Sequence, residues 1–363
     1  MSEARYRKIT LKVGSNVLTG PDGMLNESRI EHLVTQIALL KQQGVEVLFI
    51  SSGAVASGRK IIPNPRRHDT ISRRQLWASM GQVRLIQLYG DLFARHGLLC
   101  AQILATKDDF RDRRHFLNMR NCLQSILENN VVPIINENDV VSVNELMFTD
   151  NDELAGLITN MMDTDALIIL SNIDGVYDGD PALPESSLIP EVTPDMYHIS
   201  RFITAQKSNF GRGGMITKFS IAKKVASAGT PVHMANGTRD NILLDLVFNH
   251  SGTPQTLFTP LRKSSSVKKW LAHADTAIKG EVFINEGAEK SLHSHKAVSL
   301  LPIGVTRIRG EFMKGDIVGV CNPEGKLIGM GKSEYNADTA KKKIGEKNAR
   351  PIIHYDYLYL KNE

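Results

Sequence analysis

The sequence predicts an α/β protein in which helices cover both faces of a mainly parallel sheet, followed by a small β-barrel-like domain. Over the first 260 residues, short apolar, β-branched runs alternate with longer amphipathic stretches of helical spacing. This alternation is typical of parallel strands joined by helices. After about residue 260, short strand-like pieces are separated by frequent glycines, which is typical of a small β-barrel.

Six apolar runs predict buried parallel strands. They are KITLKV (8–13), VEVLFI (45–50), LLCAQIL (98–104), VVPIIN (131–136), ALIIL (166–170) and PVHMA (231–235). Helical spacing is found in the stretches 28–43, 72–96, 114–129, 152–162 and 216–228. The polar, basic segment TPLRKSSSVKKW then marks a boundary. We expect a first domain over 1–261, a linker over 262–275 and a second domain over 276–363 with one helix near ADTAKKKIG.

Composition excludes several classes of protein. With 363 residues, 42% hydrophobic and 23% charged, the chain is globular rather than disordered. No apolar run reaches the ~18 residues of a membrane span, and the first residues lack the apolar stretch of a signal peptide. Three widely separated cysteines favour a reducing compartment without disulfides or zinc. We therefore expect a cytoplasmic protein without a membrane partner.

The positive charge lies mainly in the second part of the chain. From residue 261 onward there are 18 Lys and Arg against 12 Asp and Glu, while the first 260 residues are close to neutral. Such asymmetry is found in nucleic-acid-binding tails. A basic surface exposed to water explains the same excess, so both interpretations stay open.

Polar residues follow the predicted strands, where ligands of open α/β sheets bind. Lys12 lies in the first strand, and a buried lysine is costly unless an anion meets it; the alternative is an edge lysine that reaches solvent. The turn Ser51-Ser52-Gly53 offers a hydroxyl and a helix N-terminus to an anion. It also fits a simple serine N-cap with a packing glycine.

Carboxylates and amides follow the fourth strand. Glu137 and Asp139 come first, and Asp150, Asn151 and Asp152 follow in DNDELA. Such groups can bind a substrate's amino group or hold lysines in place. Alternatively, Asp150 caps the helix that starts near Asn151, and Asp152 suits its first turn.

A glycine-rich turn, NFGRGGMITK (209–218), leads into the last long helix and places Lys218 in its first turn. Backbone N–H groups at such a helix start can hold phosphate. The spacing is not that of the Walker A motif, which requires Gly-Lys followed by Ser or Thr. The turn is therefore either an ordinary loop or a phosphate site of another kind.

Five motifs taken together resemble the amino acid kinase family. They are LKVGSNVLT, ISSGAVASG, INENDVV, DNDELA and GRGGMITK, in that order, and the resemblance covers about 1–258. The tail is similar to a PUA domain. Among the family, the pattern looks most like members that transfer the ATP γ-phosphate to the side-chain carboxylate of free L-glutamate, which begins proline biosynthesis.

The resemblance implies a role for each motif residue. Lys12 and Lys218 would contact the phosphates, and Asp150 would hold both lysines in register. Glutamate would be bound by Ser52, Gly53, Asp139 and Asn151. The nucleotide would be bound by Lys12, Ser171, Asn172, Arg212, Gly213, Gly214, Met215, Ile216, Thr217 and Lys218. Mg²⁺ would be held mainly by the nucleotide phosphates, with no metal site on the protein. The family also implies homo-oligomers and feedback inhibition by proline.

The chemistry of the residues agrees with this reaction. A glutamate side chain, with a pKa of ~4.3, is already an anionic nucleophile at neutral pH, so no general base is needed. Two rival functions remain. One is another family member's substrate, such as a carbamate, aspartate, acetylglutamate or a nucleotide. The other is RNA binding by the PUA-like tail, although its aromatic residues form no obvious stacking platform.

Overall fold

The computed structural model of the chain describes residues 3–66, 69–111, 113–141, 151–196, 214–260, 278–292, 298–347 and 349–360. The chain divides into two compact units, Met1–Lys263 and Ser264–Glu363, and each has its own sheet and its own apolar core.

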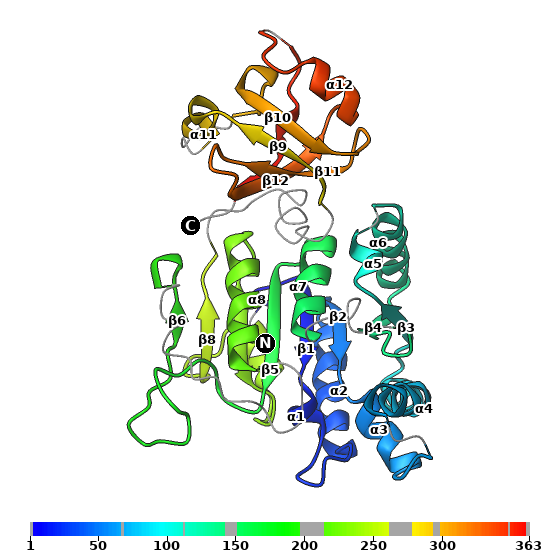
Figure 1. Cartoon of the computed structure of the whole chain (residues 1–363). Helices are drawn as coiled ribbons and strands as arrows, with labels where there is room; N and C mark the ends of the chain where they lie inside the picture. The colour runs from blue at the N-terminus through cyan, green and yellow to red at the C-terminus, as the bar shows by residue number, and fades with distance from the viewer. Residues whose placement is uncertain are drawn as a thin grey trace. The chain divides into compact units, whose positions relative to one another are not determined.

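The first unit is built on an eight-stranded sheet with the order β3-β4-β2-β1-β5-β7-β8-β6 (Figure 1). Most neighbours are parallel; β7 and β8 are the antiparallel pair. The strands are β1 (Lys8–Val13), β2 (Glu46–Ser51), β3 (Cys100–Ala105), β4 (Val132–Glu137), β5 (Ala166–Ser171), β6 (Glu191–Val192), β7 (Val232–Asn236) and β8 (Gln255–Phe258). The predicted parallel sheet is therefore confirmed.

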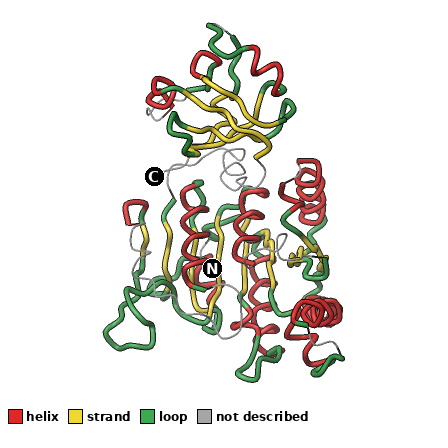
Figure 2. The backbone as a smooth tube through the Cα atoms, in the orientation of Figure 1, coloured by secondary structure: helices red, strands yellow, loops and turns green. Residues whose placement is uncertain are grey.

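Helices cover both faces of this sheet (Figure 2). They are α1 (Ser15–Leu18), α2 (Glu27–Gln42), α3 (Ala54–Ile61), α4 (Thr70–Ala94), α5 (Asp108–Arg111), α6 (Arg113–Glu128), α7 (Asn151–Met162), α8 (Met215–Ser227) and α9 (Ile242–Val247). Alternate residues of the central strands enter different cores. Ile9, Leu11 and Val13 pack with α2, α4 and α9, whereas Ile50 and Ile169 pack with α6, α7 and α8.

All six predicted strands and five predicted helices exist, with ends shifted by at most two residues. Their burial explains why they were recognisable. Five of the six residues of β1 and β2, and all six of β4 and β5, are buried, so both faces of these strands had to be apolar. The shorter elements α1, α3, α5, α9, β6 and β8 were not predicted, because too few residues carry a periodic signal.

The second unit contains a five-stranded sheet with the order β10-β9-β11-β12-β13. Its elements are β9 (Ile278–Ile284), α11 (Glu286–Leu292), η3 (Pro302–Gly304), β10 (Val305–Gly310), β11 (Ile317–Cys321), β12 (Leu327–Ser333), α12 (Ala337–Lys342) and β13 (Ile353–Leu360). Helix α12 is the predicted one, and α11 was missed. Gly310, at φ +88°, allows close contact between strands, because a Cβ there would lie 2.9 Å from Gly280 Cα.

No helix in the described ranges is both long and apolar enough to cross a membrane. The 25-residue helix α4 illustrates why, since Arg73, Arg74 and Arg84 interrupt its apolar positions.

Candidate active site

The carboxyl ends of the parallel strands meet at one edge of the first sheet, as the arrows of Figure 1 show. Lys12 is the penultimate residue of β1, and Ser51, Glu137 and Ser171 end β2, β4 and β5. This parallel arrangement brings the motifs that follow these strands to the same edge.

Lys12 is almost completely buried, with 3% of its surface exposed. It pairs in register with Ile50 and Ile169 of the neighbouring strands, so its side chain extends toward the helices of that face. The alternative of an edge lysine in solvent is therefore wrong. Burial of an ammonium group requires a counter-charge nearby.

Asp152 supplies that counter-charge and joins two lysines. Its Oδ1 lies 2.6 Å from Lys12 Nζ and its Oδ2 lies 2.9 Å from Lys218 Nζ. The side chain of Asp152 is fully buried, and it is the second residue of α7, where the helix dipole favours a negative charge. The ammonium groups from β1 and α8 therefore converge, as the sequence predicted.

The pKa of Asp152 reports the same arrangement. Burial acts to raise the pKa of this carboxyl, but the adjacent Lys12 and Lys218 ammonium groups outweigh it and hold the pKa well below its usual range. Asp152 is thus a carboxylate at every physiological pH, and its charge lies between the two cations.

The sequence predicted that Asp150 holds both lysines. Asp150 lies outside the described residues, and the carboxylate found between Lys12 and Lys218 belongs to Asp152. The motif DND offered two carboxylates. Because α7 begins at Asn151, Asp152 lies in the first turn and faces the sheet. The start of α7 was predicted to within one residue, and the prediction placed Asp152 in its first turn.

The glycine turn leads into α8, whose first turn contains Lys218. Gly214 precedes the helix, and the N–H of Lys218 donates to the carbonyl of Gly214 at 3.3 Å. Met215, Ile216 and Thr217 form the rest of the first turn, and Ile216 is 49% exposed. The predictions for Arg212 and Gly213 lie outside the described residues.

The turn after β2 meets the start of α7. Gly53 has a φ of +109°, a left-handed conformation that favours glycine. The amide nitrogen Nδ2 of Asn151 lies within hydrogen-bond distance of three acceptors: Ser51 O at 3.1 Å, Ser52 Oγ at 3.1 Å and Asn136 Oδ1 at 3.0 Å. Two predicted substrate residues, Ser52 and Asn151, are therefore in direct contact. Asn136 was not predicted, although it lies in the quoted INEND motif.

Asp139, another predicted substrate residue, follows β4 and is bound to α4. Its Oδ1 accepts hydrogen bonds from Arg74 Nε at 3.2 Å and from Arg74 Nη2 at 3.0 Å. Arg74 was not predicted, because no sequence motif links a residue of a long amphipathic helix to a turn 65 positions later.

The turn after β5 contains the predicted nucleotide residues Ser171 and Asn172. The Ser171 hydroxyl donates to Ile173 O at 2.9 Å and accepts from Ile173 N at 3.3 Å, while Asn172 is exposed. Next to this turn, Arg239 donates to both oxygens of Asp174 at 2.7 Å. The hydrogen bond from Arg239 is the main cause of a lowered pKa at Asp174.

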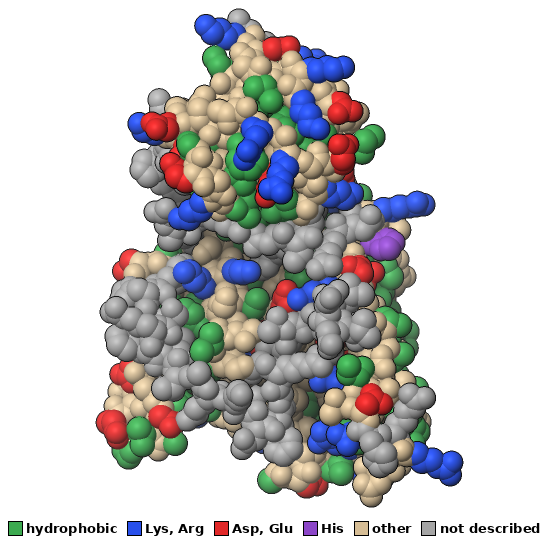
Figure 3. Space-filling model, in the orientation of Figure 1, with side chains coloured by type: hydrophobic (Ala, Val, Ile, Leu, Met, Phe, Trp, Pro, Cys, Tyr) green, Lys and Arg blue, Asp and Glu red, His purple; other side chains and the backbone are tan. Residues whose placement is uncertain are grey.

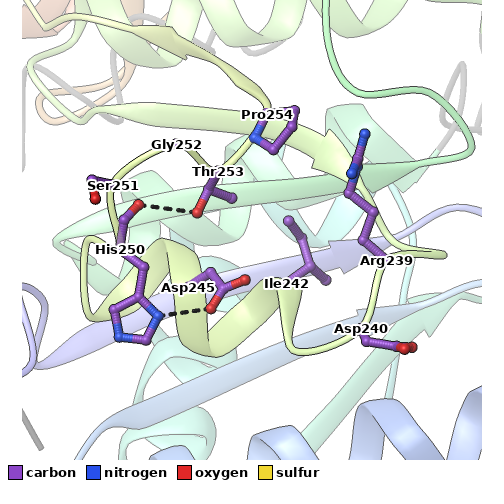
Figure 4. A pocket seen from close by; sticks show the side chains of 9 residues that line it. All are labelled: Arg239, Asp240, Ile242, Asp245, His250, Ser251, Gly252, Thr253 and Pro254. Atoms are coloured by element: carbon purple, nitrogen blue, oxygen red, sulfur yellow. Dashed lines mark hydrogen bonds and ion pairs between the residues drawn. The ribbon is translucent and has the colours of Figure 1, made fainter.

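A surface cavity of about 460 Å³ lies beside this turn, and Figure 4 shows the side chains around it. His250 Nδ1 and Asp245 Oδ1 lie 2.8 Å apart there. The cavity is lined by Arg239, Asp240, Ile242, Asp245, His250, Ser251, Gly252, Thr253 and Pro254. None of the predicted site residues belongs to this lining, so the cavity is separate from the lysine pair.

No cluster of three or more His, Cys, Asp or Glu side chains suitable for a metal ion occurs in the part of the chain that the structure describes. At the strand ends, both oxygens of Asp152 already face lysines. The described side chains therefore do not form a protein cage for Mg²⁺.

Comparison with known proteins places this geometry in a family. Residues 7–236 match the amino acid kinase family, and residues 280–355 match the PUA domain. The first match spans more than half of the chain, so the chain belongs to the amino acid kinase family and carries a PUA domain.

Curated relatives agree over nearly the whole length. A glutamate 5-kinase of Bacteroides thetaiotaomicron is 51% identical over 98% of this chain and 99% of its own length. Proteins with the same name from Chlorobaculum tepidum and Geobacter metallireducens are 46% and 40% identical, over 98% of this chain and over 98% and 95% of their own lengths.

Proposed function

We propose that this chain is a glutamate 5-kinase, which transfers the γ-phosphate of ATP to the side-chain carboxylate of L-glutamate and so begins proline biosynthesis. The observation that carries the proposal is the pair of ammonium groups on Asp152 at the carboxyl edge of the sheet. The curated relatives, which bear this name over nearly their whole length, support the choice of glutamate among the substrates of the family.

The two lysines fit the needs of phosphoryl transfer. The nucleophile is an anion that approaches another anion, and negative charge spreads over the transferring phosphoryl oxygens. Lys12 and Lys218 would neutralise that charge, and Asp152 would fix the distance between them in advance. Mg²⁺ would arrive on the nucleotide phosphates and add further positive charge there.

The contacts around Asn151 support a glutamate site beside the lysines. Asn151 donates a hydrogen bond to Ser52, which precedes Gly53 at the start of α3, and this polar corner suits a carboxylate of the substrate. Asp139 provides a negative charge for the ammonium group of the amino acid. Ser171, Asn172 and the start of α8 are the residues that we propose for the nucleotide, together with Arg212 and Gly213 from the preceding loop.

A substrate panel tests the proposal directly. Purified protein with ATP and Mg²⁺ should form an acyl phosphate from L-glutamate, trapped with hydroxylamine, and should not phosphorylate aspartate, acetylglutamate, a carbamate or a nucleotide at a comparable rate. Preference for any of these others would overturn the assignment. Adding L-proline to the same assay should raise the KM for glutamate, since we propose that proline competes at the glutamate site.

We also propose that a second copy of this chain binds along β3. Among the described strands, β3 lies at the end of the sheet and has only β4 as a neighbour, and such an edge strand can extend a sheet by pairing with another chain. Leu99 and Leu104 are 71% and 37% exposed there. Sedimentation of the wild-type chain should give a species larger than a monomer, and Leu99→Glu should shift it toward the monomer.

A cytoplasmic location fits the cysteines. Cys100, Cys122 and Cys321 are all free thiols, and Cys122 is exposed, which suits a reducing environment.

A further inference from the structure

Three side chains of helix α4 contact the end of β4 and the turn that follows it. Arg74 binds Asp139. Gln75 Nε2 donates to Val140 O at 2.9 Å, and Asn136 Nδ2 donates to Gln82 Oε1 at 3.2 Å. A single helix thus fixes a turn that contains one of the proposed glutamate ligands.

The hydrogen bonds from Arg74 orient the Asp139 carboxylate in addition to pairing with its charge. Both nitrogens of the guanidinium fork donate to the same oxygen, Oδ1, which restricts rotation of the carboxylate and so orients Oδ2. The Asp139 side chain is only 10% exposed, whereas that of Arg74 is 33% exposed. A nearly buried carboxylate depends on such a partner to remain oriented.

The position of α4 is in turn fixed against the Ser52-Gly53 turn. A Cβ at Gly81 would overlap the carbonyl oxygen of Ala54, and a Cβ at Gly58 would overlap that of Trp77. Because Ala54 is the first residue of α3 and follows Gly53, α4 packs directly on the helix that begins at the proposed substrate turn. Arg74 therefore acts from a rigid support.

We propose that Arg74 is a positioning residue for the glutamate site: its guanidinium holds the Asp139 carboxylate in the orientation that receives the ammonium group of the amino acid. The inference rests on the proposed function. Its alternative is an ordinary ion pair that contributes only to stability, and partly exposed pairs of that kind contribute little.

The test compares Arg74→Ala and Arg74→Lys with the control Arg84→Ala. Arg84 lies on the same helix and also forms an ion pair, with Glu27 at 3.6 Å, but it does not contact the turn after β4 in any bond that the structure shows. For each protein, kcat, the KM values for L-glutamate and ATP, and the thermal unfolding midpoint are measured.

We expect Arg74→Ala to raise the KM for glutamate by at least about tenfold, because a misplaced binding group weakens substrate positioning. The KM for ATP and the unfolding midpoint should stay near those of Arg84→Ala. Arg74→Lys should recover part of the lost affinity, since an ammonium group restores the charge but not the two-pronged geometry.

Three results would refute the assignment: an unchanged glutamate KM in Arg74→Ala, equal rises in both KM values, or no recovery by lysine. If Arg74→Ala does not fold, Arg74→Lys and Arg74→Gln carry the test through the same comparison of KM values. Wild-type protein that forms no acyl phosphate from glutamate would instead reject the proposed function, and this inference with it.

Discussion

At the scale of single residues, Asp152 is the group on which the proposed chemistry depends most. A buried carboxylate between two ammonium groups keeps both cations in place before ATP binds, and a site arranged in advance needs less reorganisation during the reaction. Without Asp152, the two lysines would repel each other in a setting that water screens poorly.

Asp152→Asn should therefore lower kcat by about 10²–10³, the usual loss when a preorganised electrostatic group is removed. The acyl phosphate assay measures the loss. Asp245→Asn is a matched control, because Asp245 pairs with His250 at 2.8 Å away from the lysines, and it should leave kcat unchanged. Near-normal turnover in Asp152→Asn would contradict the role assigned to this carboxylate.

A buried histidine gives a second prediction at this scale, concerning stability. His233 is 1% exposed; its Nδ1 lies 2.6 Å from Gln255 Oε1 and its Nε2 lies 2.8 Å from the Tyr6 hydroxyl. Since Gln255 Oε1 only accepts, Nδ1 carries the proton and Nε2 accepts from Tyr6. Burial lowers the pKa of His233 to about 4, so the folded state keeps this ring neutral.

The free energy of unfolding should consequently increase with pH. The histidine of the unfolded chain has a pKa of ~6.5 and binds a proton below that pH, whereas the folded one does not. The free energy of unfolding is therefore highest above pH ~6.5 and decreases as the pH falls toward about 4. Urea unfolding between pH 4.5 and 7.5 measures it. His233→Gln should flatten the profile, and an unchanged slope in this variant would contradict the role assigned to the ring. Asp152 also lowers the free energy of unfolding as the pH falls, but only below about pH 4, where carboxylates of the unfolded chain gain protons.

At the scale of helices and strands, the sequence could predict the elements that are long and buried. β1, β2, β4 and β5 have apolar residues on both faces, and α2, α4, α6, α7 and α8 have more than three turns each, so each carries a signal that is independent of the rest of the chain. The motifs at the strand ends also correctly predicted that Lys12, Ser52, Asn151 and Lys218 lie at the carboxyl ends of the parallel strands.

Pairing across the chain could not be predicted in the same way. That Asp152 contacts both lysines depends on the direction in which the first turn of α7 faces. The link from Arg74 to Asp139 joins two elements that only the fold brings together. The contact of α4 with α3 is also invisible in the sequence, because Gly58 and Gly81 give no hint that each faces the backbone of the other helix.

The close contact between α3 and α4 leads to a prediction with an internal control. Gly81→Ala should lower the free energy of unfolding by about 1–3 kcal/mol or more, because its Cβ would overlap the backbone of Ala54 and force the helices apart. Gly90→Ala, on the same helix with nothing within 4 Å of the added Cβ, should instead stabilise by about 0.5–1 kcal/mol. Chemical denaturation measures both, and equal effects would contradict the packing argument.

At the scale of the whole molecule, the chain divides into two units with separate apolar cores. The second unit has its own core, which includes Val282, Ile284, Val318 and Val320. Its basic side chains do not gather on the face seen in Figure 3, where acidic ones lie among them. Several form ion pairs, such as Lys279 with Asp316 and Lys314 with Glu334. This mixture favours a basic surface exposed to water over an RNA site.

Since every described residue of the lysine cluster and of the α4 contacts lies in the first unit, the fragment 1–263 should keep acyl phosphate formation with the kcat and glutamate KM of the full chain. The physical reason is that the strand-end geometry is set by β1, α7 and α8, which pack into the cores of that unit. Kinetics and thermal unfolding of the fragment beside the full chain measure this. A folded fragment with much lower kcat would mean that the PUA unit completes the active site. If the full chain bound RNA with an affinity that falls steeply with salt, and the fragment did not, the PUA unit would have a nucleic-acid partner.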